Sequence, residues 1–145
     1  MERAVATVQD AGLTPVLAHP ERSSMFLNDP DRLERLVARG VLCSITAASM
    51  EGGFGDRMRR FAIQLLTNGL VHDVASDAHD HVHRPPDLGT GFERLEPELP
   101  GIEEYRAWFT VTAPVALLAG RPVPPTPELV PAQVPRWRRV IGRRH

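Results

Sequence analysis

An aspartate and a histidine two residues apart, Asp77 and His79, stand between a short apolar segment and a polar loop. The segment over residues 70–76 is typical of a buried strand, because it is apolar and bounded by turn-forming residues. Residues i and i+2 of a strand point to the same side, so we expect the carboxylate and the imidazole to project together if strand geometry continues to its end. Both groups bind divalent metal ions. On spacing alone, a turn-capping carboxylate beside a surface imidazole explains the pair equally well.

A second apolar segment, residues 14–19, also ends in a histidine, His19, and an arginine, Arg22, follows three residues later. The planar guanidinium of an arginine binds two phosphate oxygens at once. Its presence near metal-type ligands favours a metal-dependent site for an anionic substrate. Two ordinary alternatives stay open: a hydrogen bond between His19 and the backbone, and an ion pair between Arg22 and Glu21.

The composition excludes several classes of mechanism. All 17 residues counted as lysine or arginine are arginines, which excludes a Schiff-base enzyme and a Walker-type nucleotide site. Cys43 is the only cysteine, and a serine stands six residues later, where a thiol phosphatase needs an arginine. A lone cysteine forms no intramolecular disulfide and favours a reducing compartment. Since no apolar segment has the length of a membrane span, we expect a cytoplasmic protein that is not transmembrane.

The hydrophobic pattern predicts alternating helices and strands. We expect helices over residues 2–11, 30–40, 56–68 and 100–110, a short helical turn over 114–118, and strands over 14–19, 41–45 and 70–76. This order implies parallel strands joined by crossover helices. In such folds the functional sites lie at the C-terminal ends of the strands, where His19 and Asp77 stand.

Several separated motifs match one known family in the right order. They are Ala18-His19-Pro20-Glu21-Arg22, Gly52-x-Phe54-Gly55, Ala75-Ser76-Asp77-Ala78-His79 and a later Arg84. Over residues 5–120 the chain therefore resembles the C-terminal half of the bacterial capsule-type metal-dependent tyrosine-protein phosphatases, of the PHP superfamily. The resemblance implies an α/β fold, an incomplete PHP-type distorted (β/α)7 barrel in which about three parallel strands are joined by crossover helices.

The resemblance also implies roles for individual residues. His19, Asp77 and His79 match metal ligands, and Arg22 and Arg84 match the arginines that hold the substrate phosphate. The implied cofactor is a divalent metal, manganese first, with zinc, iron or cobalt as other candidates. The implied reaction is hydrolysis of phosphotyrosine in a partner protein, a bacterial tyrosine kinase of polysaccharide export. We expect no nucleic-acid partner, and an oligomer is compatible with the sequence.

Departures from the family define the alternatives. The His-x-His pair and the Asp-Asp stretch with which the family opens are missing here, so we expect a truncated protein or a subunit that needs a partner. Two other functions stay open: a small-metabolite phosphatase of the histidinol-phosphatase type, and an inactive remnant. We expect a partial phosphatase domain over residues 1–120, followed by a poorly ordered proline-rich linker and basic tail over 121–145.

Three further features receive ordinary interpretations. His72 is expected to pack within the sheet or against a helix rather than to bind metal. The glycine-rich segment 52–55 could cradle an anion on its backbone amides, but a turn that admits the following helix is preferred. Cys43 is expected to be a small buried strand residue and not a nucleophile.

Overall fold

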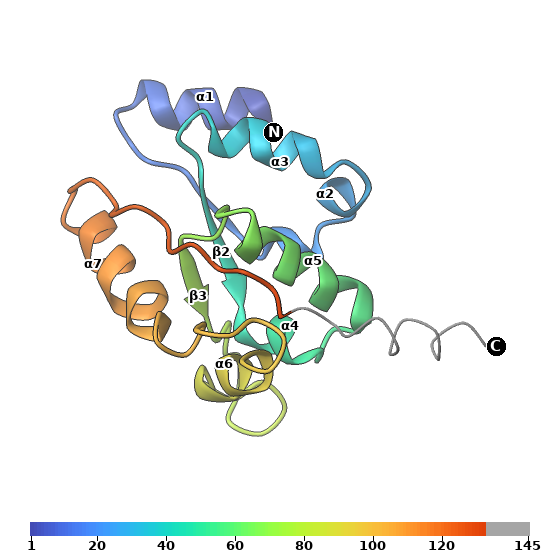
Figure 1. The fold of residues 1–145 in the computed structure, drawn as a ribbon. Coiled ribbons are helices and arrows are strands. Elements are labelled where there is room, and N and C mark those ends of the chain that lie inside the picture. The colour runs from blue at the N-terminus through green and yellow to red at the C-terminus, as the bar shows by residue number, and fades with distance from the viewer. Residues whose placement is uncertain (133–145) are drawn as a thin grey trace.

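A three-stranded parallel sheet forms the centre of the computed structural model, which describes residues 1–132 (Figure 1). The strands are β1 (Val16–Ala18), β2 (Leu42–Thr46) and β3 (Asp73–Ala75), in that spatial order. Helices connect consecutive strands, as parallel pairing requires. The mixed α/β fold with three parallel strands and crossover helices is thereby confirmed.

The helices follow the expected pattern in most places. Among the described residues they are α1 (Glu2–Asp10), η1 (Pro20–Arg22), α2 (Ser24–Asn28), α3 (Pro30–Val37), α4 (Ala47–Glu51), α5 (Asp56–Thr67), α6 (Gly89–Leu95), η2 (Trp108–Thr112) and α7 (Ala113–Leu118). Helix α3 begins where its capping residues predict, because the Asp29 carboxylate accepts a hydrogen bond from the Arg32 amide and Pro30 occupies the first turn. Helix α5 buries the predicted apolar stripe, which includes Phe61 and Leu65.

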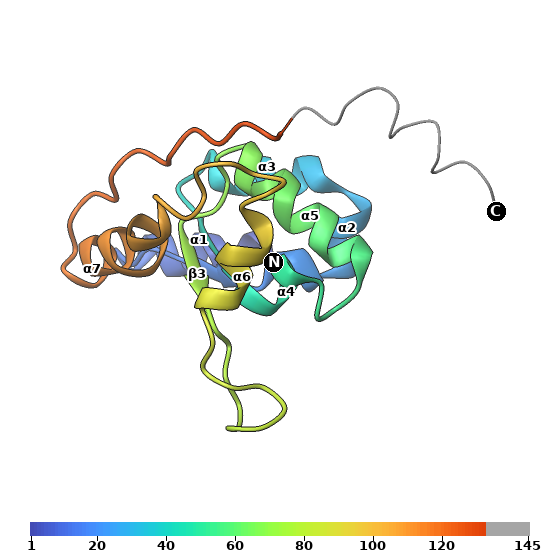
Figure 2. The ribbon, with the colours of Figure 1, turned by 60° about the horizontal axis from the view of Figure 1, so that its bottom comes forward.

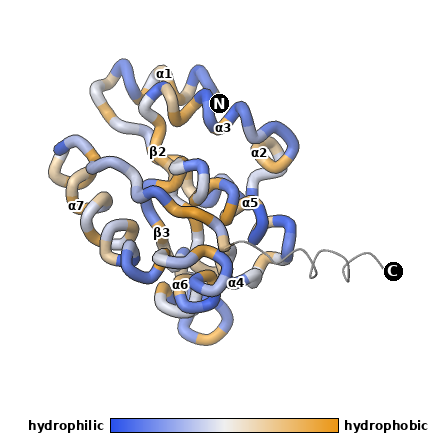
Figure 3. The backbone as a smooth tube through the Cα atoms, in the orientation of Figure 1, coloured by the Kyte–Doolittle hydropathy of each residue, from blue (hydrophilic) through white to orange (hydrophobic). Residues whose placement is uncertain are grey.

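Different helices pack against the two faces of the sheet. Ile45 of β2 is aligned with Val74 of β3, and these side chains and that of Cys43 are buried in the core that α3 and α5 complete. Burial of each large side chain in this core stabilises the fold by about 1.5–3 kcal/mol. The other face carries Leu42 and Asp73 and is partly covered by α7, which lies across the sheet from α5 (Figure 1). Figure 3 shows hydrophobic colour in the middle of the molecule, around β2 and α5.

Strand β1 is an edge of the sheet. Within residues 1–132 it pairs with β2 and with no other strand. Its residues Val16 and Ala18 are exposed, whereas Leu17 between them is half-buried. The outer backbone groups of β1 therefore lack a strand partner in this part of the chain.

Three expectations about secondary structure need correction. The helix predicted over 100–110 is wrong in its first half, because residues 98–105 form turns and Gly101 adopts a φ of +90°. The chain becomes helical only near residue 106 and continues through η2 into α7. The strands predicted over 14–19 and 70–76 are both shorter, since β1 covers only Val16–Ala18 and β3 covers only Asp73–Ala75. Helices α2, α4 and α6 were not predicted at all.

The proline-rich segment that follows α7 contains no helix or strand as far as residue 132. It nevertheless lies against the body of the protein: Leu129 is buried, and the Ala132 amide donates a hydrogen bond to the Glu98 carbonyl. The basic tail expected over 136–145 lies outside the described residues. Among the helices of residues 1–132, none combines the length and apolar character needed to cross a membrane.

The contact between α4 and α6 generates a stability test. A Cβ at Gly91 would lie 2.7 Å from the Ala47 carbonyl oxygen, so Gly91→Ala must push the two helices apart. We expect a loss of about 1–3 kcal/mol in the free energy of unfolding, measured by urea denaturation. Gly89→Ala in the same helix is the matched control, because its Cβ would meet nothing closer than 3.7 Å. Equal stability of the two variants would contradict this packing.

Candidate active site

Two strand ends at one edge of the sheet carry the predicted metal ligands. His19 follows β1 directly, and Asp77 follows β3 by two residues. Their φ angles are 40° and 52°, and among the described residues they are the only non-glycine positions with positive φ. Such a conformation costs about 1–3 kcal/mol and is concentrated at functional sites in proteins. The two strained positions, His19 and Asp77, are thus two of the residues that the sequence motifs indicate as functional.

The strained backbone at Asp77 corrects one expectation. Strand geometry does not continue to His79, because β3 ends at Ala75 and the chain turns at Asp77. The carboxylate and the imidazole therefore do not project in parallel from a strand. Instead the His79 ring Nδ1 lies 2.8 Å from the Asp77 backbone oxygen and 3.9 Å from its carboxylate Oδ1.

Arg22 and Arg84 meet at the Asp77 carboxylate. The Nη1 of Arg22 donates to Asp77 Oδ2 at 2.8 Å, and the Nη2 of Arg84 donates to the same oxygen and, at 3.0 Å, to the Asp77 backbone oxygen. Partial burial opposes ionisation of this carboxyl, but the hydrogen bond from Arg22 and the charge of Arg84 hold the pKa of Asp77 below its usual value. Arg22 therefore pairs with Asp77 rather than with Glu21.

The loop after β3 is folded so that Arg84 faces Asp77. The Asp80 carboxylate accepts hydrogen bonds from the backbone amides of Val82, His83 and Arg84. The amide of His79 donates to the carbonyl of Arg84, which closes the loop at its base. Figure 2 shows this loop, in yellow-green after β3, projecting from the body of the protein. Its base is where the two arginines come together.

A buried carboxylate, Glu21, anchors the turn that carries His19 and Arg22. Its side chain is fully buried, and its Oε1 accepts hydrogen bonds from the Thr46 amide at 3.0 Å, the Thr46 hydroxyl at 2.9 Å and the Ser49 hydroxyl at 2.7 Å. Within residues 1–132 its Oε2 has no hydrogen-bond partner. Sequence reasoning missed this role. The available signal was the presence of hydroxyl residues, Thr46 and Ser49 among them, in a mostly apolar segment.

The segment 52–55 acts as a turn into α5. The amides of Gly52, Gly53 and Gly55 donate to the backbone carbonyls of Ser49, Ala48 and Gly52. These amides are therefore occupied by hydrogen bonds within the protein. This favours the interpretation of the segment as a turn that leads into α5 over its interpretation as an anion-binding loop. The turn places Phe54 against the arginines, with its ring centroid 4.1 Å from Cζ of Arg22 and 6.0 Å from Cζ of Arg84.

The donor atoms here suit a divalent cation in kind, since imidazole and carboxylate both ligate such metals. Within residues 1–132, however, no group of three or more histidine, cysteine, aspartate or glutamate side chains is placed to hold one. Asp77 and His79 lie together, whereas His19 stands apart at the end of β1. The described residues thus bring two of the three predicted ligands, Asp77 and His79, together and do not add His19 to them.

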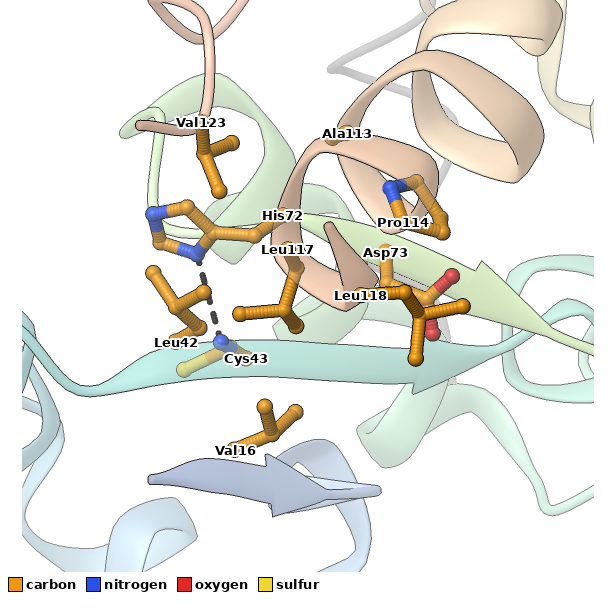
Figure 4. A pocket seen from close by; sticks show the side chains of 10 residues that line it. All are labelled: Val16, Leu42, Cys43, His72, Asp73, Ala113, Pro114, Leu117, Leu118 and Val123. Atoms are coloured by element: carbon orange, nitrogen blue, oxygen red, sulfur yellow. Dashed lines mark hydrogen bonds between the residues drawn. The ribbon is translucent and has the colours of Figure 1, made fainter. Parts of the chain in front are cut away.

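A separate pocket of about 180 Å³ lies away from these strand ends, between the sheet and α7 (Figure 4). His72 lies in its wall, and its Nδ1 accepts a hydrogen bond from the Cys43 amide at 3.2 Å. Burial lowers the pKa of His72. Burial, with a smaller effect from the charge of Glu21, raises the pKa of Cys43 to about 12. His72 packs as expected, and Cys43 is unsuited to nucleophilic attack.

Comparisons with known proteins agree on one family. A family model described as "Capsular polysaccharide synthesis, CpsB/CapC" matches residues 1–118. Among curated proteins, the chain is 38% identical over 78 residues to the putative tyrosine-protein phosphatase CapC of Staphylococcus aureus, covering 54% of this chain and 31% of that protein. It is 41% identical over 73 residues to the tyrosine-protein phosphatase YwqE of Bacillus subtilis (strain 168), covering 50% of this chain and 29% of the relative.

The fold has a counterpart among solved structures. A structure described with YwqE from Bacillus subtilis and CpsB from Streptococcus pneumoniae, "unique metal-dependent tyrosine phosphatases", matches with a TM-score of 0.75 and 30% sequence identity. The match covers 92% of this chain and 52% of that chain. The described chain therefore spans about half the length of the solved protein, and the alignments cover about a third of the curated relatives.

The buried carboxylate generates one prediction. Glu21→Ala removes the acceptor for a buried amide and two hydroxyls, so we expect the free energy of unfolding to fall by about 2–4 kcal/mol in urea denaturation. Glu104→Ala is the control, because Glu104 is exposed and the change is expected to alter stability by less than about 0.5 kcal/mol. A Glu21→Ala protein as stable as the control variant would show that the carboxylate does not hold the turn.

The buried histidine generates a second prediction. Because burial lowers the pKa of His72 in the folded protein, the unfolded chain binds more protons below about pH 6.5, and stability falls as the pH drops through that range. His72→Asn keeps a hydrogen-bond acceptor near the Cys43 amide but does not titrate. We expect a flatter dependence of unfolding free energy on pH for this variant between pH 7.5 and 5. Parallel curves for the two proteins would contradict the assignment.

Proposed function

Because this chain belongs to the CpsB/CapC family of capsular polysaccharide synthesis, we propose that it provides the phosphate-binding part of a metal-dependent protein-tyrosine phosphatase. The observation that carries the proposal is the convergence of Arg22 and Arg84, from two different strand ends, on Asp77. Two guanidinium groups at the C-terminal edge of a parallel sheet suit the dianionic phosphate group of a phosphate monoester.

In the proposed chemistry, two arginines bind the phosphate and three other residues bind the metal. Arg22 and Arg84 bind the non-bridging phosphate oxygens and neutralise the charge that develops on them. Asp77 orients both guanidinium groups, and with His19 and His79 it contributes ligands for a divalent metal, manganese in the first instance. When bound, such a metal supplies a water molecule of lowered pKa for attack on phosphorus. A tyrosine phenolate is a good leaving group, so a strong general acid is less necessary than for an alkyl ester.

The proposed substrate is phosphotyrosine in a bacterial kinase that controls capsular or exopolysaccharide export. The family description and the tyrosine-phosphatase names of the relatives support this choice. The proposed compartment is the cytoplasm, because the single buried cysteine is compatible with reducing conditions. The remaining metal ligands in the proposal come from the part of the longer relatives that this chain does not match.

The test is phosphate release from a phosphotyrosine peptide in Mn²⁺ buffer. The chain is assayed alone and together with the unmatched part of YwqE, supplied as a second polypeptide. We expect Asp77→Asn to lower turnover at least about a hundredfold. Arg22→Lys and Arg84→Lys are expected to lower kcat/KM about ten- to a hundredfold each, because lysine cannot bind two phosphate oxygens in the planar geometry of a guanidinium.

Arg35→Lys is the matched control, since Arg35 lies on α3, is exposed and pairs only with Asp29, the N-cap residue of that helix, among the described ion pairs. Unchanged turnover by Asp77→Asn would rule out the proposed site. Better turnover of histidinol phosphate than of the peptide would favour a small-metabolite phosphatase. Absence of hydrolysis by the wild-type chain under both conditions would favour the inactive alternative.

A further inference from the structure

Phe54 is the exception among the five phenylalanines of this chain. The other four are at most 5% exposed and belong to the hydrophobic core, whereas Phe54 is only half-buried and lies outside the core cluster. Its placement does little for core packing, since a partly exposed ring at a loop tip buries less apolar surface than a core residue. The position therefore needs another explanation.

The loop that carries Phe54 is shaped to hold the ring in place. Gly52 and Gly55 adopt φ angles of 93° and 95°, which side-chain-bearing residues rarely tolerate. A Cβ at Gly53 would lie 3.1 Å from the Ala48 carbonyl oxygen. The loop is thus pressed against α4, the helix that Glu21 anchors through Ser49. Phe54 is fixed relative to the turn that carries Arg22.

The ring of Phe54 contacts both phosphate-binding arginines. Its centroid is 4.1 Å from Cζ of Arg22, a distance typical of stacking between an aromatic ring and a guanidinium, and 6.0 Å from Cζ of Arg84. Such contact occupies the flat face of the guanidinium and leaves its N–H groups at the edge free to bind oxygen. The ring therefore limits the orientations of the arginines without competing for a phosphate.

A pocket of about 190 Å³ lies beside the same ring. Phe54, Arg84, Ser76 and Pro85 line it, together with the carboxylate-bearing residues Glu51 and Asp87. Because Arg84 belongs both to this pocket and to the cluster around Asp77, a phosphate held by the arginines would lie at the rim of the pocket. The organic group attached to that phosphate would then be next to Phe54.

We propose that Phe54 and the adjacent pocket form a subsite for the aryl group of the substrate, and that Phe54 makes the site prefer an aryl phosphate to a phosphate that carries no aryl group. This inference rests on the proposed phosphatase function and names the residue that distinguishes its substrates. An aromatic ring gains from packing against another ring in offset or edge-on geometry, which an alkyl chain cannot reproduce.

The test compares two ligands in Mn²⁺ buffer by calorimetry: a peptide carrying a non-hydrolysable phosphotyrosine analogue (an aryl phosphonate) and inorganic phosphate. We expect Phe54→Leu to raise the Kd of the aryl phosphonate about tenfold and that of inorganic phosphate no more than about twofold. Phe54→Tyr, which keeps the ring, is expected to retain wild-type preference. In steady-state assays the loss should appear mainly in KM for the phosphotyrosine peptide rather than in kcat.

Tyr105→Leu is the control for loss of a partly exposed aromatic residue outside this region. Equal weakening of both ligands by Phe54→Leu, or unchanged affinity for the aryl phosphonate, would overturn the subsite while leaving the phosphatase proposal intact. A wild-type protein that binds neither ligand would overturn both proposals.

Discussion

The buried carboxylate of Glu21 is the interaction on which the arrangement of the site depends. It joins two pieces that are separated in sequence: the turn after β1, and the end of β2 with the first turn of α4 that follows it directly. A buried carboxyl group is costly unless hydrogen bonds satisfy it; here Oε1 receives three of them, whereas Oε2 has no partner within residues 1–132. The network is therefore specific, because any other placement of the turn leaves these buried groups without partners.

Charge pairing complements this anchor on the solvent side of the site. Asp77 draws two guanidinium groups to one place, although like charges at that separation repel each other. The backbone strain at His19 and Asp77 persists because the surrounding contacts over-determine both turns. The interior thus fixes the backbone, and the half-exposed ion pairs fix the direction of the long side chains.

Much of the fold was predictable from local patterns, and the site only in part. The stripe of Phe61 and Leu65 predicts α5, because a helix repeats its buried face every three to four residues. Helix α6 was missed because it starts with Gly89-Thr90-Gly91, a sequence with low helix propensity. Glycine is needed at position 91 because the backbone of α4 approaches too closely for a side chain. The left-handed turn at Asp77 was also missed. Tertiary contacts impose this conformation, and the presence of an aspartate alone does not predict it.

The edge position of β1 has a geometric consequence for the ligand set. Neighbouring strands of a sheet lie roughly 5 Å apart, and parallel partners end at the same margin. Any additional strand that pairs in parallel with the outer side of β1 would therefore deliver its final residue next to His19. Backbone pairing along this short strand would therefore bring further donor groups to the proposed metal site, beside the His19 imidazole.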